Sequence, residues 1–128
     1  MEILYIEPTS TTPLVHFDKQ IGLLDLRGRS SPENSVSFYS NILEHIDHYC
    51  KVGSVLTANF SFEYFNTSSL KNIFVLLQRI VKFWKAGGSV EVNWYYEEDD
   101  EDMFEAGEDL NEILGLPFNF KEIQYQIA

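Results

Sequence analysis

Residues 54–96 read SVLTANFSFEYFNTSSLKNIFVLLQRIVKFWKAGGSVEVNWYY, and this stretch decides the fold because it holds two strand patterns with a helix pattern between them. Residues 54–64 are rich in β-branched and aromatic residues with polar ones interleaved, and residues 89–96 alternate apolar with polar, as strands do. Residues 67–85 carry apolar side chains at steps of three and four, which predicts an amphipathic helix. Strand, helix and strand in this order predict a right-handed crossover between parallel neighbours.

Three more strands are predicted upstream of this unit. They cover residues 3–7, 14–18 and 21–27, because each run is apolar or alternates between apolar and polar residues. Gly28 is expected to close the third of these strands. The second and third strands are expected to form a hairpin.

A helix is predicted to follow these strands. The helix start is expected in the segment that ends at Asn34. In it, Ser30 has the place of a hydroxyl N-cap, Pro32 that of a first-turn proline, and Glu33 that of the glutamate in a capping box. The apolar face of the helix is expected to carry Phe38, Tyr39, Ile42, Leu43, Ile46, Tyr49 and Cys50. Gly53 is expected to end the helix or the loop after it.

The C-terminal third begins with six consecutive acidic residues, Glu97 to Asp102, which predict a solvated loop because like charges repel. A helix over 103–116 and a strand over 118–127 complete the chain. The element order is therefore β-β-β-α-β-α-β-α-β. It predicts an α/β fold: a single domain over residues 1–128 with one mixed sheet, helices packed on it, and one face more open than the other.

The composition excludes several classes of function. The 128 residues carry 9 Lys and Arg against 20 Asp and Glu, a net charge of −11, so binding to nucleic acid or to an anionic membrane is disfavoured, whereas a basic protein partner is favoured. The sequence has neither a run of about 18 apolar residues nor a signal-peptide pattern, which predicts a cytoplasmic protein. The single cysteine, Cys50, fits a reducing compartment and is expected to act as a small buried hydrophobe.

The sequence gives little support for an enzyme. His45 and His48 lie three residues apart on the predicted helix but lack a third zinc ligand at a recognisable spacing. A strained nucleophile turn and a glycine-rich phosphate loop are both absent from the pattern. We therefore expect no catalytic residue, metal site or cofactor. A divalent-metal-dependent enzyme that uses Glu97 to Asp102 stays open as an alternative, because hard cations bind carboxylates.

The joint between the strand and the helix of residues 54–85 carries the candidate site. Asn66 or Thr67 is a natural N-cap, and capping alone would explain part of this sequence. It does not require three successive hydroxyls, Thr67, Ser68 and Ser69. A phosphate there would add about −1.5 to −2 charges at a helix N-terminus, where the helix dipole favours an anion. A constitutive interaction module, in which the hydroxyls only cap the helix, is the other alternative.

Three segments give the chain a resemblance to the SiaC family of bacterial regulatory phosphoproteins, which are similar to STAS-domain anti-sigma-factor antagonists in fold and in partner switching. These segments are Ser10-Thr11-Thr12-Pro13, Gly28-Arg29-Ser30-Ser31-Pro32-Glu33-Asn34 and Tyr64-Phe65-Asn66-Thr67-Ser68-Ser69. The second and third are specific in combination, and the resemblance runs from the first strand to the last.

The resemblance implies a non-enzymatic switch that is phosphorylated on Thr67, with Ser68 and Ser69 as the next candidates. It implies a protein kinase that adds the phosphate and a metal-dependent Ser/Thr phosphatase that removes it. The unphosphorylated form would bind and activate a diguanylate cyclase, and so control cyclic di-GMP signalling and biofilm growth or aggregation. The expected partner-binding residues are Asn66, Thr67, Ser68, Ser69, Pro32, Glu33 and Asn34.

Overall fold

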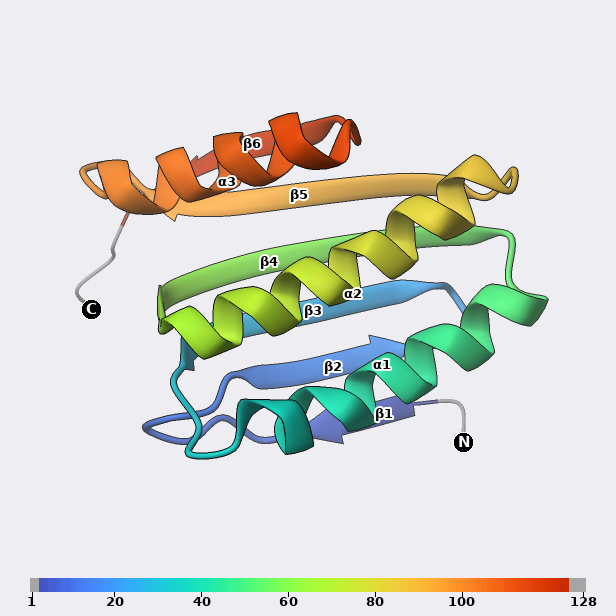
Figure 1. Cartoon of the computed structure of the whole chain (residues 1–128), viewed down its shortest axis with the longest axis horizontal. Coiled ribbons are helices and arrows are strands. Elements are labelled where there is room, and N and C mark those ends of the chain that lie inside the picture. Colours follow the sequence, from blue (N-terminus) through green and yellow to red (C-terminus); the bar gives the residue numbers. More distant parts are fainter. Residues whose placement is uncertain (1–2, 125–128) are drawn as a thin grey trace.

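The computed structural model describes residues 3–124, which form one mixed sheet with helices packed on it (Figure 1). The strands are β1 (Ile3–Ile6), β2 (Leu14–Asp18), β3 (Leu23–Ser30), β4 (Val55–Phe65), β5 (Ser89–Glu97) and β6 (Phe118–Ile123). The helices are α1 (Ser35–Val52), α2 (Thr67–Lys85) and α3 (Glu101–Leu114). The predicted fold class and the predicted element order are confirmed.

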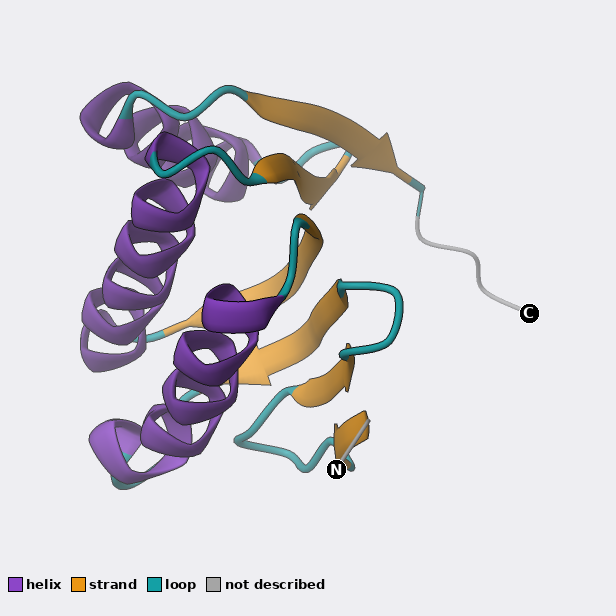
Figure 2. Ribbon diagram, turned by 90° about the vertical axis from the view of Figure 1, so that its right-hand side faces the viewer, coloured by secondary structure: helices purple, strands orange, loops and turns teal. Residues whose placement is uncertain are grey.

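The strands lie in the sheet in the order in which they occur along the chain. β1, β2 and β3 pair antiparallel, which confirms the predicted hairpin, whereas β3 to β6 pair parallel through α1, α2 and α3. Each crossover moves one strand in the same direction across the sheet. Crossovers of one hand that advance in one direction place their helices on one face. Figure 2 shows the helices on that face and the other face bare, as predicted.

The core lies between the helices and the covered face of the sheet. Each strand gives it alternate residues, such as Leu24 and Leu26 of β3 and Phe60 of β4, which are fully buried. Trp94 of β5 is fully buried as well, and its indole Nε1 donates a hydrogen bond to the carbonyl oxygen of Met103 at 3.0 Å. Among residues 3–124, no helix is both long enough and apolar enough to cross a membrane.

The chain departs from prediction between β3 and α1. Gly28 does not close the third strand, because its positive φ of 113° accommodates a bulge in the β3–β4 register, and pairing continues to Ser30. Ser30 therefore cannot be the N-cap of α1, and the predicted capping box with Glu33 is wrong. Asn34 caps α1 instead, with its Oδ1 accepting a hydrogen bond from Ser37 N at 3.0 Å. The strand start predicted at Ile21 is also wrong, because Ile21 lies in the turn before Leu23 and is 63% exposed.

The acidic stretch is only partly a loop. Glu97 ends β5, Asp100 is the N-cap of α3, and Glu101 and Asp102 form the first turn of that helix. Carboxylates are stabilising at this end of a helix, so α3 begins earlier than predicted. It ends at Leu114 rather than at residue 116. The strand predicted over 118–127 ends at Ile123, and residues 125–127 of that prediction lie outside the described residues.

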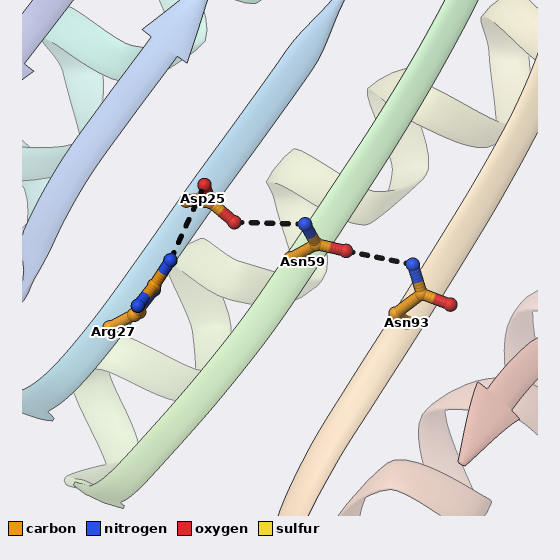
Figure 3. A network of polar contacts seen from close by, with 4 residues as sticks. All are labelled: Asp25, Arg27, Asn59 and Asn93. Atoms are coloured by element: carbon orange, nitrogen blue, oxygen red, sulfur yellow. Dashed lines mark hydrogen bonds and ion pairs between the residues drawn. The ribbon is translucent and has the colours of Figure 1, made fainter. Parts of the chain in front are cut away.

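The bare face carries a row of polar side chains at one register across the parallel strands β3 to β6. Figure 3 shows the part of the row that is formed by Asp25, Asn59 and Asn93. Asn119 Nδ2 donates to Asn93 Oδ1 at 3.1 Å, Asn93 Nδ2 to Asn59 Oδ1 at 2.8 Å, and Asn59 Nδ2 to Asp25 Oδ1 at 2.9 Å. The Arg27 guanidinium lies 3.8 Å from the other Asp25 oxygen. Between strands every amide of the row donates toward β3, so the row ends on the Asp25 carboxylate, which accepts. Asn93 Nδ2 also donates to Glu91 Oε2 on its own strand at 2.9 Å.

Candidate functional site

Asn66 is the residue that caps α2. Its Oδ1 accepts hydrogen bonds from Ser69 N at 2.8 Å and from Ser68 Oγ at 3.2 Å, and its carbonyl oxygen accepts the first helical bond from Leu70 N at 3.0 Å. Its backbone N–H donates to the carbonyl oxygen of Ser30 at 3.0 Å, which ties the cap to the end of β3. The cap is therefore complete without the hydroxyl of Thr67.

The three hydroxyls after Asn66 lie in three different environments. Thr67 is exposed, and its hydroxyl has no hydrogen-bond partner among residues 3–124. Ser68 is also exposed, but its hydroxyl donates to the Asn66 side chain. Ser69 is fully buried and accepts a hydrogen bond from Ser30 Oγ at 2.9 Å. Of these three hydroxyls, only that of Thr67 is both accessible and without a hydrogen-bond partner in the described part of the chain.

A buried chain of hydroxyls supports the joint from below. The Tyr39 hydroxyl of α1 lies 2.7 Å from Ser30 Oγ of β3, which in turn reaches Ser69 of α2. Because Ser30 donates to Ser69, the remaining bond has Tyr39 donating to Ser30. Burial raises the pKa of Tyr39 to about 12, against a smaller opposing effect of the Ser30 hydrogen bond. This chain fixes the starts of α1 and α2 relative to the end of β3.

The second predicted segment lies beside the first. Pro32 is buried, whereas Glu33 and Asn34 are exposed at the start of α1. Asn72 Nδ2 of α2 donates to Ser35 Oγ, the first residue of α1, at 3.1 Å. The starts of α1 and α2 therefore lie next to each other, at the same edge of the covered face (Figure 1).

An apolar groove runs between α2 and α3 and begins at Thr67. It has a volume of about 670 Å³ and is lined by Thr67, Leu70, Lys71, Phe74, Val75, Ala106, Asp109, Leu110 and Ile113. Ile113 is 69% exposed, and Leu70 and Phe74 are half-buried. An exposed apolar surface beside a polar joint is typical of a protein-binding site.

The charges around this groove are few. Among the described residues that line it, Lys71 is the cation and Asp109 the acid. The first turn of α2 contains no acidic residue, so no carboxylate of its own offsets the positive end of that helix. The groove end at Thr67 can therefore accept an added negative charge.

The other sequence candidates do not converge. The His45 Nδ1 lies 2.7 Å from Lys19 Nζ, and burial, with the Lys19 charge as a smaller cause, lowers the pKa of His45. Asp100 and Asp102 line a separate cavity of about 330 Å³, but the Asp100 carboxylate accepts the Met103 N–H as the cap of α3. Residues 3–124 contain no group of three or more His, Cys, Asp or Glu side chains placed to hold a metal ion.

Sequence reasoning missed most of the groove. The α3 side of it comes from Ala106, Asp109, Leu110 and Ile113, which lie far from Thr67 in the sequence. It also missed Ser30 and Tyr39 as supports of the joint. A hydroxyl at the end of one strand gives no local signal for a partner on another element.

The comparisons with known proteins agree over nearly the whole chain. The chain is 29% identical over 119 residues, 92% of its length, to an uncharacterized protein of Pseudomonas aeruginosa strain UCBPP-PA14, 94% of which is covered. It is similar to the crystal structure of apo-SiaC from Pseudomonas aeruginosa (29% identity, TM-score 0.87, 94% of this chain and 99% of that one). It is also similar to a chain in the crystal structure of the diguanylate cyclase SiaD in complex with its activator SiaC from the same organism (28% identity, TM-score 0.89, with the same coverage). The family model described as SiaC family regulatory phosphoprotein matches residues 6–123, so the chain belongs to this family.

Proposed function

We propose that this protein is a regulatory switch that binds and activates a diguanylate cyclase when Thr67 is unphosphorylated and releases it when Thr67 is phosphorylated. The solved complex of a similar SiaC chain with the cyclase it activates supports the choice of partner. In this role the protein modulates another enzyme and contributes no catalytic group of its own. Its output is the cyclic di-GMP level, and through it biofilm growth or aggregation.

The observation that carries the proposal is the free, exposed hydroxyl of Thr67 beside a completed helix cap. A kinase needs an accessible hydroxyl, and the Ser69 hydroxyl is buried and bonded to Ser30. Ser68 is accessible, but phosphorylation would remove the hydrogen that its hydroxyl donates to Asn66. Modification of Thr67 leaves every hydrogen bond of the cap in place.

The position of Thr67 explains how a phosphate would act on binding. Thr67 lines the mouth of the apolar groove between α2 and α3, together with Leu70 and Phe74. A partner that buries this groove would have to remove water from the phosphate, which carries about −1.5 to −2 charges. The groove would then lose its partner without any change in the fold.

A cycle of this kind needs two further enzymes. We propose a dedicated protein kinase that phosphorylates Thr67 and a metal-dependent Ser/Thr phosphatase that reverses the reaction, all in the cytoplasm. The Asn72–Ser35 bond brings the two predicted segments together. Their accessible residues, Glu33, Asn34 and Asn66 to Ser68, form the surface that these enzymes and the cyclase would share, whereas the predicted residues Pro32 and Ser69 are buried and support it from within.

The experiment compares Thr67→Ala, Thr67→Glu and the matched control Ser68→Ala with the wild-type protein in its own cells. Each tagged protein is recovered, its bound partners are identified, and its phosphosites are mapped by mass spectrometry. We expect phosphate at residue 67 in the wild type and in Ser68→Ala, and the cyclase with wild type, Thr67→Ala and Ser68→Ala but not with Thr67→Glu. Equal recovery of the cyclase by Thr67→Glu would favour the constitutive module instead.

A further inference from the structure

Lys71 follows Thr67 by four residues on α2, so the two side chains project from the same side of the helix. Both line the groove between α2 and α3, and both are exposed. Within residues 3–124, Lys71 forms no ion pair, since the described pairs are Arg27 with Asp25 and Arg79 with Asp47. In the described part of the chain Lys71 is thus a cation without an ion-pair partner, one helical turn from the proposed phosphosite.

Across the groove, α3 presents Asp109. The adjoining cavity, which shares Ala106 with the groove, is lined by the further acids Glu63, Asp100 and Asp102. A phosphate at Thr67 therefore enters a groove lined by the acid Asp109 and the cation Lys71, beside a cavity that is lined by further acids. Attraction to Lys71 favours one position of the phosphate over the others.

We propose that Lys71 is the counter-ion that holds the phosphate of Thr67 over the groove and so strengthens the block that phosphorylation places on the partner. The inference rests on the proposed function, because it needs a phosphate at residue 67. An anion four residues before a lysine is the favourable orientation of a helical ion pair. Lys71 acts as a positioning residue: it draws the phosphate along α2 toward Leu70 and Phe74 instead of leaving it pointing to solvent.

Pairing has a second consequence for the groove. When the Lys71 ammonium group pairs with the phosphate, the aliphatic part of its side chain lies across the apolar lining of the groove. A lysine side chain can cover apolar surface in this way while its charged end binds a polar group. Lys71 then no longer offsets the negative charge of Asp109 across the groove. The phosphorylated groove is narrower and more acidic than the free one, and both changes oppose docking of the same partner.

The test places phosphothreonine at residue 67 during translation, so that no kinase is required, and follows the phosphate by ³¹P NMR across a pH titration. The proteins are the otherwise wild-type phosphoprotein, Lys71→Met, Lys71→Arg and the control Lys82→Met, which removes a charge from the last turn of the same helix. Lys71→Met should raise the second pKa of the phosphate by about 0.3 units, the shift expected for loss of one helical ion pair. Lys71→Arg and Lys82→Met should leave this pKa within about 0.1 unit of the wild-type value.

A binding measurement with the same four proteins completes the test. Phosphorylated Lys71→Met should bind the cyclase at least about twofold more tightly than the other three phosphoproteins, because its phosphate is no longer held over the groove. The inference would be overturned if Lys71→Met left the phosphate pKa unchanged, or if Lys82→Met raised this pKa as much as Lys71→Met does. Either result would count even if phosphorylation still abolished binding. If phosphothreonine at residue 67 leaves cyclase binding unaffected in the wild-type background, the proposed function itself fails, while the pKa comparison still decides whether Lys71 pairs with the phosphate.

Discussion

Replacing Asn66 and Thr67 separately by alanine should divide the structural role of the joint from its regulatory role. Asn66→Ala removes the oxygen that accepts the Ser69 N–H at 2.8 Å and the Ser68 hydroxyl at 3.2 Å. Loss of an asparagine cap costs about 1 kcal/mol. Thr67→Ala removes an exposed hydroxyl without a partner in the described chain, so its cost should stay within about 0.5 kcal/mol.

Urea and thermal unfolding of the purified variants provide the assay. Asn66→Ala should lower the melting temperature by roughly 3–5 °C for a chain of this size, and Asn66→Asp, which keeps an accepting oxygen, should recover most of that loss. Thr67→Ala should melt within about 2 °C of the wild type. If Thr67→Ala cost as much stability as Asn66→Ala, Thr67 would be a structural residue of the cap, and a change of regulation in this variant could not be attributed to the missing phosphate alone.

Three further outcomes follow from the rest of the fold. Asn59→Ala should lower the free energy of unfolding by about 1–3 kcal/mol in urea titrations, because it breaks the amide row and removes the donor to the buried Asp25 carboxylate. Gly107→Ala should destabilise by about 1–3 kcal/mol, since the new Cβ would lie 2.5 Å from Cδ1 of the buried Trp94 ring, and near-ultraviolet circular dichroism should report the shifted indole. Because the pKa of Tyr39 is raised to about 12 in the folded protein, its contribution to stability is complete below pH 10 and should fall between pH 10 and 12. Tyr39→Phe should flatten this part of the curve of unfolding free energy against pH, whereas an unchanged slope would contradict the buried hydroxyl chain.

The order of elements was predictable because each long element has a local pattern. The steps of three and four in α2 and the alternation in β5 are properties of neighbouring residues, so a single segment reveals them. The more open face was also expected. The sequential strand order was not, because the hand of a crossover does not fix the direction in which the next strand is added. The confirmed family adds the expectation of a regulatory phosphoprotein.

The errors arose where tertiary structure overrode a local signal. Ser30 has the spacing of a helix cap, but the bulge at Gly28 extends β3 and takes Ser30 into the sheet and into a bond with Ser69. The acidic run looks like a solvated loop, yet Asp100 caps α3 and two of the acids occupy its first turn. The groove could not be predicted, because helical spacing shows that a helix has an apolar face without showing which part its neighbour leaves uncovered.

The most direct test of the central claim measures binding of this protein to its cyclase by calorimetry, with threonine and then phosphothreonine at residue 67. We expect a defined complex with the unphosphorylated protein and a stimulated rate of cyclic di-GMP synthesis. Phosphothreonine should weaken binding at least about tenfold, or about 1.4 kcal/mol, and remove the stimulation, while the melting temperature of the free protein does not fall. Equal affinity and equal stimulation by the two forms would contradict it.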